Sequence, residues 1–289
     1  MTETEHNAEQ RDAERGAEAA PTIFMTGGSR GIGLAIATKL AAGGAKVALM
    51  AKTDTPDPRL PGTVHTAAAQ IEEAGGQALP IIGDVRDDVA VGEAIARTAE
   101  RFGGIDIVVN NASAIALQGF GELSMKRYDL MQDINARGTF SVLSHAREHL
   151  LKSARPRVLT LSPPLALESQ WLAEYAPYTL SKFAMTMLTL GFAEQHRAEG
   201  VAASCLWPQT LIATAAVQNV VAGDEGMKSA RRPEIMADAA ARVLSMSADE
   251  ANGQCFVDEA VLRDAGTSDF SQYLFEGATE ESLEKDLFL

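Results

Sequence analysis

Short apolar runs alternate with amphipathic segments along most of this chain. The runs that predict buried strands span residues 21–26, 46–51, 78–82, 105–109, 157–161, 201–206 and 254–257. Apolar residues at helical spacing fall between them, as over 88–102, where Val91, Ile95 and Phe102 share one face. Strands that alternate with helices fold into a parallel sheet covered on both faces. We therefore predict one α/β domain over residues 21–266, a doubly wound sheet of about seven strands.

The two ends of the chain depart from this pattern. Residues 1–20 carry six acids against two arginines and almost no large apolar side chain, so we expect a disordered acidic leader. Residues 267–289 mix aromatic and acidic side chains and form a C-terminal extension. We expect this extension to be partly docked, with the aromatic side chains of 270–275 on a neighbouring subunit, or disordered, above all beyond them.

Composition argues against several classes of function. A formal charge of −14 repels polyanions, so we expect no nucleic-acid partner. No stretch approaches 18 consecutive apolar residues, so we expect no membrane span. Cys205 and Cys255 lie in apolar runs, which favours two reduced thiols and a cytoplasmic location over one disulfide. His145 and His149 are spaced i, i+4, yet no third ligand accompanies them, and we expect no metal site.

A glycine-rich turn follows the first apolar run and opens the next helix. It consists of Thr26, Gly27, Gly28, Ser29, Arg30, Gly31, Ile32 and Gly33. Glycines at these places allow a tight turn, a close approach of backbone to a pyrophosphate, and close packing of helix on strand. This context predicts a Rossmann-type dinucleotide site. We take all residues of the turn except Gly28 as cofactor-binding candidates.

The end of the second predicted strand bears on the choice of cofactor. An NAD site usually places an acid there to bind the ribose 2′-hydroxyl. This chain has Lys52 instead, and the first acid after the strand, Asp54, comes two residues later. Arg30 adds a second cation from the glycine turn. Two cations without an acid suit a 2′-phosphate, so NADP(H) is favoured and NAD(H) stays possible.

Three residues predict acid–base chemistry. Tyr178 and Lys182 are spaced i, i+4 and so lie on one face of a helix. The ammonium is expected to lower the pKa of the phenol toward neutrality, where it can exchange a proton with an alcohol oxygen. Ser162, at the end of the fifth predicted strand, can hydrogen-bond the same oxygen. Tyr175 is a weaker candidate, because Thr179 at its i+4 position supplies no charge.

Together these motifs resemble the classical short-chain dehydrogenase/reductases, over about residues 21–266. The motif residues Thr26, Gly27, Gly31 and Gly33 match the cofactor turn of that family, and Ser162, Tyr178 and Lys182 match its catalytic set. The resemblance implies that Asn135 supports a proton-relay water and that Tyr178 and Lys182 also bind cofactor. It further implies cofactor contacts at Asp84, Val85, Asn111, Ala112, Ser113, Pro208 and Gln209. It also implies a homodimer or homotetramer, paired through helices around 126–152 and 177–199.

The chain departs from the family pattern in several places. Ser113 and Gln209 each replace a glycine near the cofactor, and Glu259 replaces the glycine after the last strand. Ser162 and Tyr178 stand 16 residues apart, which is more than the usual spacing and lengthens the loop between them. Segments around these departures resemble a narrower group within the family.

These observations predict an NADP-dependent oxidoreductase. It would interconvert a hydrophobic alcohol and its aldehyde or ketone, because the loops around 165–171 and 211–230 carry more apolar than charged side chains. An alternative function is an NADP(H)-binding regulatory or carrier-associated protein with little turnover. Gln209 and Ser113, both close to the cofactor by resemblance, are the residues that suggest it.

Overall fold

A single parallel sheet forms the centre of the protein. The computed structural model describes residues 20–57, 62–221 and 223–289, so the predicted leader over 1–20 lies almost wholly outside the described residues. The sheet order is β3-β2-β1-β4-β5-β6-β7, and every neighbouring pair is parallel. The strands are β1 (Thr22–Thr26), β2 (Lys46–Ala51), β3 (Gln77–Ile82), β4 (Ile107–Asn110), β5 (Arg157–Thr160), β6 (Ala202–Trp207) and β7 (Cys255–Val257). The predicted doubly wound α/β sheet is confirmed.

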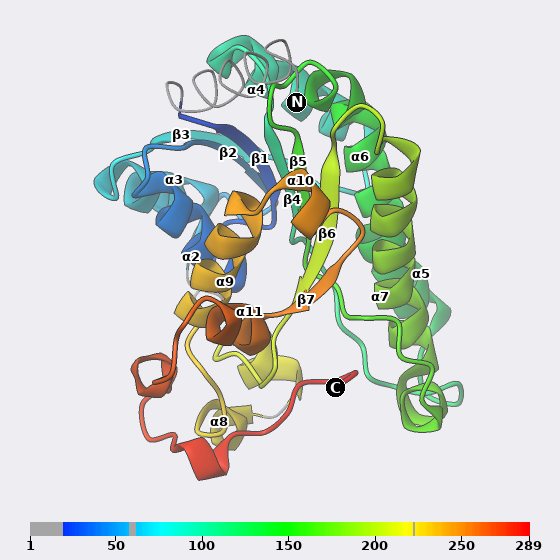
Figure 1. The fold of residues 1–289 in the computed structure, drawn as a ribbon. Coiled ribbons are helices and arrows are strands. Elements are labelled where there is room, and N and C mark those ends of the chain that lie inside the picture. Colours follow the sequence, from blue (N-terminus) through cyan, green and yellow to red (C-terminus); the bar gives the residue numbers. More distant parts are fainter. Residues whose placement is uncertain (1–19, 58–61, 222) are drawn as a thin grey trace.

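Helices cover both faces of the sheet (Figure 1). One face carries α2 (Gly31–Ala41), α3 (Val64–Glu73), α9 (Glu234–Ser245) and α11 (Asp258–Asp264). The other carries α4 (Asp88–Phe102), α6 (Gly138–Leu150) and α7 (Ser169–Gln195), with α5 (Met125–Gln132) beside α7. Alternate residues of a strand point to opposite faces. Ile23 and Met25 therefore join the first core, and Phe24 joins the second.

The long helix expected over 126–152 is divided in two. A π-helical turn, Asp133–Arg137, separates α5 from α6. Asn135 lies in that turn, where its side-chain oxygen accepts a hydrogen bond from the Ala114 N–H at 2.7 Å. Its amide group donates to the Ala114 carbonyl and to Ser181 Oγ, both at 2.9 Å. Such wide turns are frequent at functional sites, and hydrophobic periodicity does not reveal them.

Helix α7 begins earlier than the sequence predicts. Two helical stretches meet at Tyr175, whose φ of −128° and ψ of 26° are not helical. The second stretch begins at Pro177, as expected, because proline lacks an N–H and fits the first turn of a helix. The stretched interval between Ser162 and Tyr178 therefore holds an additional short helix, over residues 169–174.

A buried guanidinium anchors the C-terminal extension. Arg231 is 2% exposed and donates hydrogen bonds to Glu259 Oε2 at 3.1 Å, Glu280 Oε2 at 2.9 Å and the Phe270 carbonyl at 3.2 Å. A buried charge persists only with several such partners. Docking on a neighbouring subunit was expected for residues 270–275, whereas Phe270 and Tyr273 are buried against the core of the same chain. The extension then continues across the carboxyl end of the sheet, and Phe288 near its end is buried as well (Figure 1).

Candidate active site

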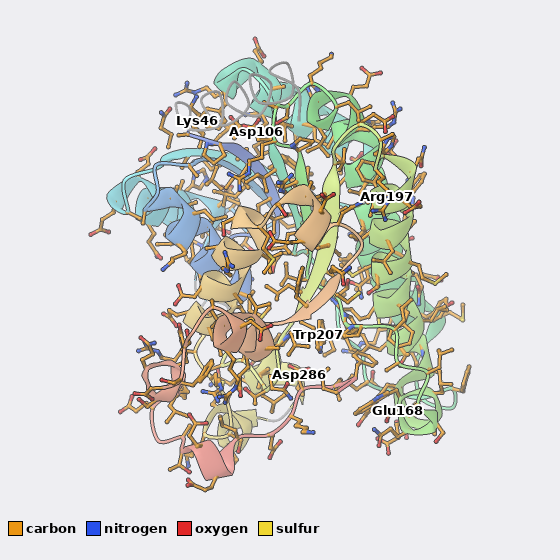
Figure 2. The ribbon with its side chains drawn as sticks, viewed as in Figure 1. Lys46, Asp106, Glu168, Arg197, Trp207 and Asp286 are labelled. Atoms are coloured by element: carbon orange, nitrogen blue, oxygen red, sulfur yellow. The ribbon has the colours of Figure 1, made fainter. Side chains whose placement is uncertain are left out.

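A cleft of about 1910 Å³ lies along the carboxyl ends of the strands. Figure 2 labels Trp207 and Asp286 at this end of the sheet and Lys46 and Asp106 at the opposite end. Trp207 and Asp286 line the cleft. Doubly wound sheets bind ligands outside the carboxyl ends of their strands, in the crevice that forms where the strand order reverses. In this sheet the reversal falls between β1 and β4.

Two positions of the glycine turn are so tightly surrounded that only glycine fits them. Gly27 has a φ of +72°, and a Cβ there would lie 2.8 Å from Ala112 Cα. A Cβ on Gly33 would overlap the Asn111 side chain. Asn111 Nδ2 in turn donates to the carbonyls of Thr26, at 3.1 Å, and Gly27, at 2.9 Å. The turn at the start of α2 is thus a rigid backbone cradle open to the cleft, which fits the pyrophosphate of a dinucleotide.

Both predicted cations line the cleft near the end of β2. Arg30 Nη2 donates to Thr53 Oγ1 and to the Gly62 carbonyl, both at 2.9 Å. Lys52 Nζ lies 3.6 Å from Asp84 Oδ2. All of these residues line the same part of the cleft. Thr53 and Gly62 escaped the sequence analysis, because only the folded loop brings them to the Arg30 guanidinium.

Tyr178 and Lys182 lie side by side on the wall of the cleft, as the i, i+4 spacing predicts. Lys182 Nζ donates to the Leu161 carbonyl at 2.6 Å and sits 4.9 Å from the centre of the Trp207 ring. Burial lowers the pKa of Lys182 to about 7, although the Asp286 carboxylate acts to raise it. The ammonium is therefore held at the site by a carbonyl, a ring and a nearby carboxylate.

The pKa of Tyr178 moves in the direction opposite to our prediction. Burial raises it, and the negative charge of Asp286 raises it further. The prediction considered only the cation one turn away. It left out the burial of the phenol and a carboxylate more than 100 residues downstream. Because Asp286 is brought in by the extension, its effect on the phenol depends on where that segment lies.

The other two catalytic candidates are buried behind the wall of the cleft. Ser162 is fully buried, and its Oγ makes no conventional hydrogen bond among the described residues; the Cys205 thiol beside it is a weak partner. Asn135 is also fully buried and holds the loop at Ala114. Both roles stay predictions.

Most of the predicted cofactor residues line the cleft. They are Gly27, Ser29, Arg30, Gly31, Ile32, Gly33, Lys52, Asp84, Val85, Asn111, Ala112, Ser113, Tyr178, Lys182 and Pro208. Thr26 lies just behind it, where its Oγ1 accepts hydrogen bonds from the N–H groups of Asn111 and Ala112. Gln209 is not among the lining residues. Its N–H donates to Asp258 Oδ1 and its carbonyl accepts from the Asp286 N–H, so its contact with cofactor stays a prediction.

The sequence analysis missed the aromatic cluster on the substrate side of Tyr178. Phe288 is buried there, with its ring centre 5.9 Å from those of Tyr178 and Trp207. Trp171 and Phe183 complete the cluster, at 5.6 and 5.5 Å from Phe288. No local pattern in the sequence places Phe288, the last aromatic residue of the chain, beside these side chains.

Within residues 20–57, 62–221 and 223–289, no group of three or more His, Cys, Asp or Glu side chains is arranged to hold a metal ion. His145 instead lies 3.2 Å from Asp88 Oδ1. Over the same residues, none of the helices combines the length and the apolar character needed to cross a membrane.

Known proteins share this fold and much of this sequence. A family model described as short chain dehydrogenase matches residues 21–225. Hydroxysteroid dehydrogenase-like protein 2 of Danio rerio is 49% identical over 255 residues, or 88% of this chain and 61% of that protein. The protein of the same name from Homo sapiens is 42% identical, over 93% of this chain and 63% of its own length. The narrower group suggested by the sequence is this one, and that resemblance is confirmed.

A crystal structure of a short chain dehydrogenase from Mycobacterium thermoresistibile is also similar. It is 50% identical and superposes with a TM-score of 0.87, covering 93% of this chain and 95% of that chain. By contrast, this chain spans only about three fifths of the length of the curated relatives it matches.

Asp258 should make the stability of the protein depend on pH. Burial raises its pKa to about 7, although the N–H groups of Gln209 and Glu259 act to lower it. The folded state therefore binds more protons than the unfolded state between about pH 4 and 7, and stability falls as pH rises through that window. Asp258→Asn keeps the acceptor oxygen but cannot ionise. Between these pH values we expect wild type to lose about 1–3 kcal/mol more unfolding free energy than Asp258→Asn does.

Urea denaturation at fixed protein concentration measures this difference. Asp264→Asn, which changes an exposed carboxylate on the same helix, is the matched control and should follow wild type. Parallel pH profiles for wild type and Asp258→Asn would contradict the assignment.

Proposed function

The chain belongs to the short-chain dehydrogenase/reductase family, and we propose that it interconverts a hydrophobic alcohol and the matching aldehyde or ketone. The observation that carries this proposal is the position of Tyr178 and Lys182 on the same cleft as the glycine turn. A nucleotide site and an acid–base pair that share one cleft are the minimum that hydride transfer to a carbonyl requires.

Each residue has a role that follows from its chemistry. A bound nicotinamide nucleotide supplies or accepts the hydride. Tyr178 exchanges the proton on the substrate oxygen, and Lys182 stabilises the phenolate form. Ser162 would hydrogen-bond the same oxygen, and its buried Oγ, which makes no conventional hydrogen bond among the described residues, supports such a role. Because the Asp286 carboxylate raises the pKa of Tyr178, deprotonation is easier once Asp286 is neutral or displaced.

The lining of the substrate side supports an apolar substrate. Around Tyr178 the buried side chains are Ala116, Met131, Phe183, Trp207 and Phe288. Burying a charged substrate among them would cost several kcal/mol, whereas an apolar one gains from the same contacts.

The cofactor we propose is NADP(H). Arg30 and Lys52 both line the cleft at the end of β2, where a ribose 2′-phosphate would lie. Asp84 is close by, but Arg86 Nη2 lies 2.6 Å from its carboxylate and Lys52 approaches it as well. That carboxylate is therefore already engaged by cations, which supports a phosphate site over one for a bare hydroxyl.

The alternative function also has an observation in its favour. Phe288 fills the space in front of Tyr178, so the site as folded leaves little room for a substrate. A protein that binds NADP(H) and turns over little would have such a site.

The oligomer we propose forms through the outer faces of α6 and α7. Large apolar side chains are exposed there, namely Phe140, Leu180 and Met187. The helices lie side by side on one flank of the molecule (Figure 1). Several large apolar side chains exposed on two neighbouring helices are typical of a protein interface and support a homodimer or homotetramer.

Removal of the Tyr178 hydroxyl should abolish turnover. With NADPH and a panel of hydrophobic aldehydes and ketones, we expect Tyr178→Phe to lower kcat/KM at least about 100-fold, because general acid–base catalysis contributes that much or more. Absorbance of the reduced nicotinamide follows the reaction. Tyr175→Phe removes a hydroxyl from the same helix without a lysine one turn away, and it should stay within threefold of wild type.

The result separates the two functions. Equal activity of Tyr178→Phe and wild type would sink the proposed mechanism. Tight NADPH binding without turnover of any substrate would favour the regulatory alternative.

Loss of either cation should weaken NADPH more than NADH. We expect wild type to bind NADPH at least about tenfold more tightly than NADH, and Arg30→Ala or Lys52→Ala to lose most of that preference, because each removes a charge-assisted contact. Fluorescence titration of wild type and both variants gives the six dissociation constants. Lys46→Ala changes the lysine at the opposite end of β2, away from the cleft (Figure 2), and should leave both affinities unchanged. Tighter binding of NADH by wild type would refute the NADP(H) proposal.

Charges placed on the apolar flank should dissociate the oligomer. We expect wild type to sediment as a dimer or tetramer and the double variant Leu180→Glu, Met187→Glu to sediment as a monomer, since buried carboxylates oppose association. Analytical ultracentrifugation makes the measurement. Val89→Glu, an exposed apolar residue on α4, serves as control. A monomeric wild type at micromolar concentration would exclude the interface.

A further inference from the structure

Residues 286–289 occupy the place in front of the candidate acid–base pair. We call them the closing segment. The Phe288 ring is 2% exposed and is surrounded by the rings of Trp171, Tyr178, Phe183 and Trp207, with centres 5.5 to 5.9 Å away. A single aromatic side chain thus fills an aromatic cage of which one wall is the proposed catalytic phenol.

Backbone contacts hold the closing segment beside the loop that follows β6. The Trp207 indole N–H donates to the Leu287 carbonyl at 2.8 Å. The Asp286 N–H donates to the Gln209 carbonyl at 3.2 Å, and Thr210 bridges Lys285 in antiparallel fashion. These backbone contacts are few and all go to the end of β6 and the loop after it, so departure of the segment would break few backbone hydrogen bonds.

The conformation of Phe288 is itself unfavourable. Its φ of +74° makes it the only non-glycine residue with positive φ in the described part of the chain. This region is costly for a bulky side chain, because its Cβ crowds the backbone. The burial of the ring therefore holds the backbone in a conformation that it does not prefer, and the strain offsets part of what burial gains.

The closing segment lies beside the polar side chains of the candidate site. Lys182 Nζ is hydrogen-bonded to the Leu161 carbonyl, and Ser162 Oγ has no conventional partner. The Asp286 side chain lines the cleft beside Tyr178 and Lys182. A substrate oxygen that reaches Tyr178 with its apolar group in the cage would need the volume that Phe288 fills.

We propose that the closing segment is an internal occupant of the substrate pocket, which a substrate bearing a flat apolar group of about the size of a phenyl ring must displace. This inference rests on the proposed function only where it calls the displacing ligand a substrate. The competition between ligand and closing segment is a property of binding. The cage selects for aromatic or similarly flat groups, because its four rings fit the faces and edges of a fifth. Displacement of the segment also removes the Asp286 carboxylate from the neighbourhood of Tyr178.

Competition by an internal occupant has a measurable signature. The apparent affinity of any ligand for the cage is reduced by the fraction of molecules in which the cage is open. Phe288→Ala removes the occupant and leaves the cage. We therefore expect Phe288→Ala to bind benzyl alcohol at least tenfold more tightly than wild type.

The chain carries its own probe for this experiment. Its two tryptophans, Trp171 and Trp207, both contact Phe288. Benzyl alcohol is titrated into the NADPH-free protein while tryptophan emission, excited at the red edge, is followed. In wild type the emission must change as Phe288 is displaced. Phe275→Ala is the matched control, since Phe275 lies on the same extension but packs in a separate cluster with Leu211 and Val217. Its affinity for benzyl alcohol should stay within twofold of wild type.

Two outcomes would overturn the inference. One is a dissociation constant for Phe288→Ala within twofold of the wild-type value; the other is saturable binding to wild type with no change in emission. Should Phe288→Ala not fold, Phe288→Gly carries the same test, because glycine adopts a φ of +74° without strain. Repeating the titration in the Tyr178→Phe background keeps the result independent of turnover. If wild type turns over no substrate but Phe288→Ala still binds benzyl alcohol more tightly, only the proposed function is contradicted and the inference stands.

Discussion

The side-chain amide of Asn111 joins the two halves of the sheet at the point where the strand order reverses. It extends from the end of β4 to the carbonyls of Thr26 and Gly27 at the end of β1. The space that it occupies is the space that a side chain on Gly33 would need. The crevice of a doubly wound sheet exists because neighbouring crossovers run in opposite directions. Asn111 fixes the width of that crevice, and the cradle for a pyrophosphate follows from it.

The sequence predicts best what local patterns determine. Apolar runs gave the strands to within a few residues, and the spacing of Val91, Ile95 and Phe102 gave the bounds of α4. The glycine turn and the Tyr178–Lys182 pair were found because each is a short motif whose parts meet through one turn or one helix. Departures came where a distant contact overrides a local preference. The π-helical turn at Asn135 forms to satisfy the loop at Ala114, and hydrophobic periodicity carries no trace of it.

The largest failure of prediction concerns electrostatics at the site. The spacing of Tyr178 and Lys182 predicts a lowered pKa for the phenol, yet burial and Asp286 raise it. Asp286 lies in the C-terminal extension, which Arg231 anchors from a distance through Glu259 and Glu280. Among the partners of Arg231, Glu280 and the Phe270 carbonyl belong to the extension and Glu259 belongs to α11, so Arg231 joins segments that the sequence gives no reason to associate. The environment of the phenol is therefore set by two parts of the chain. One is helix α7, which carries the phenol, and the other is the end of the C-terminal extension, which few contacts hold.

The π-helical turn at Asp133–Arg137 has a consequence for evolution as well as for geometry. An α-helix advances by roughly 100° per residue. Deletion of one residue from this turn would restore a regular helix, and α6 would keep nearly the same rotation relative to α5, because a π-helical turn holds one residue more than an α-helical turn for about the same rotation. Phe140 would still face outward, whereas Asn135 depends on the wide turn for its position at Ala114. A single irregularity of the backbone thus allows a candidate catalytic amide to be gained or lost without disturbing the apolar flank on α6.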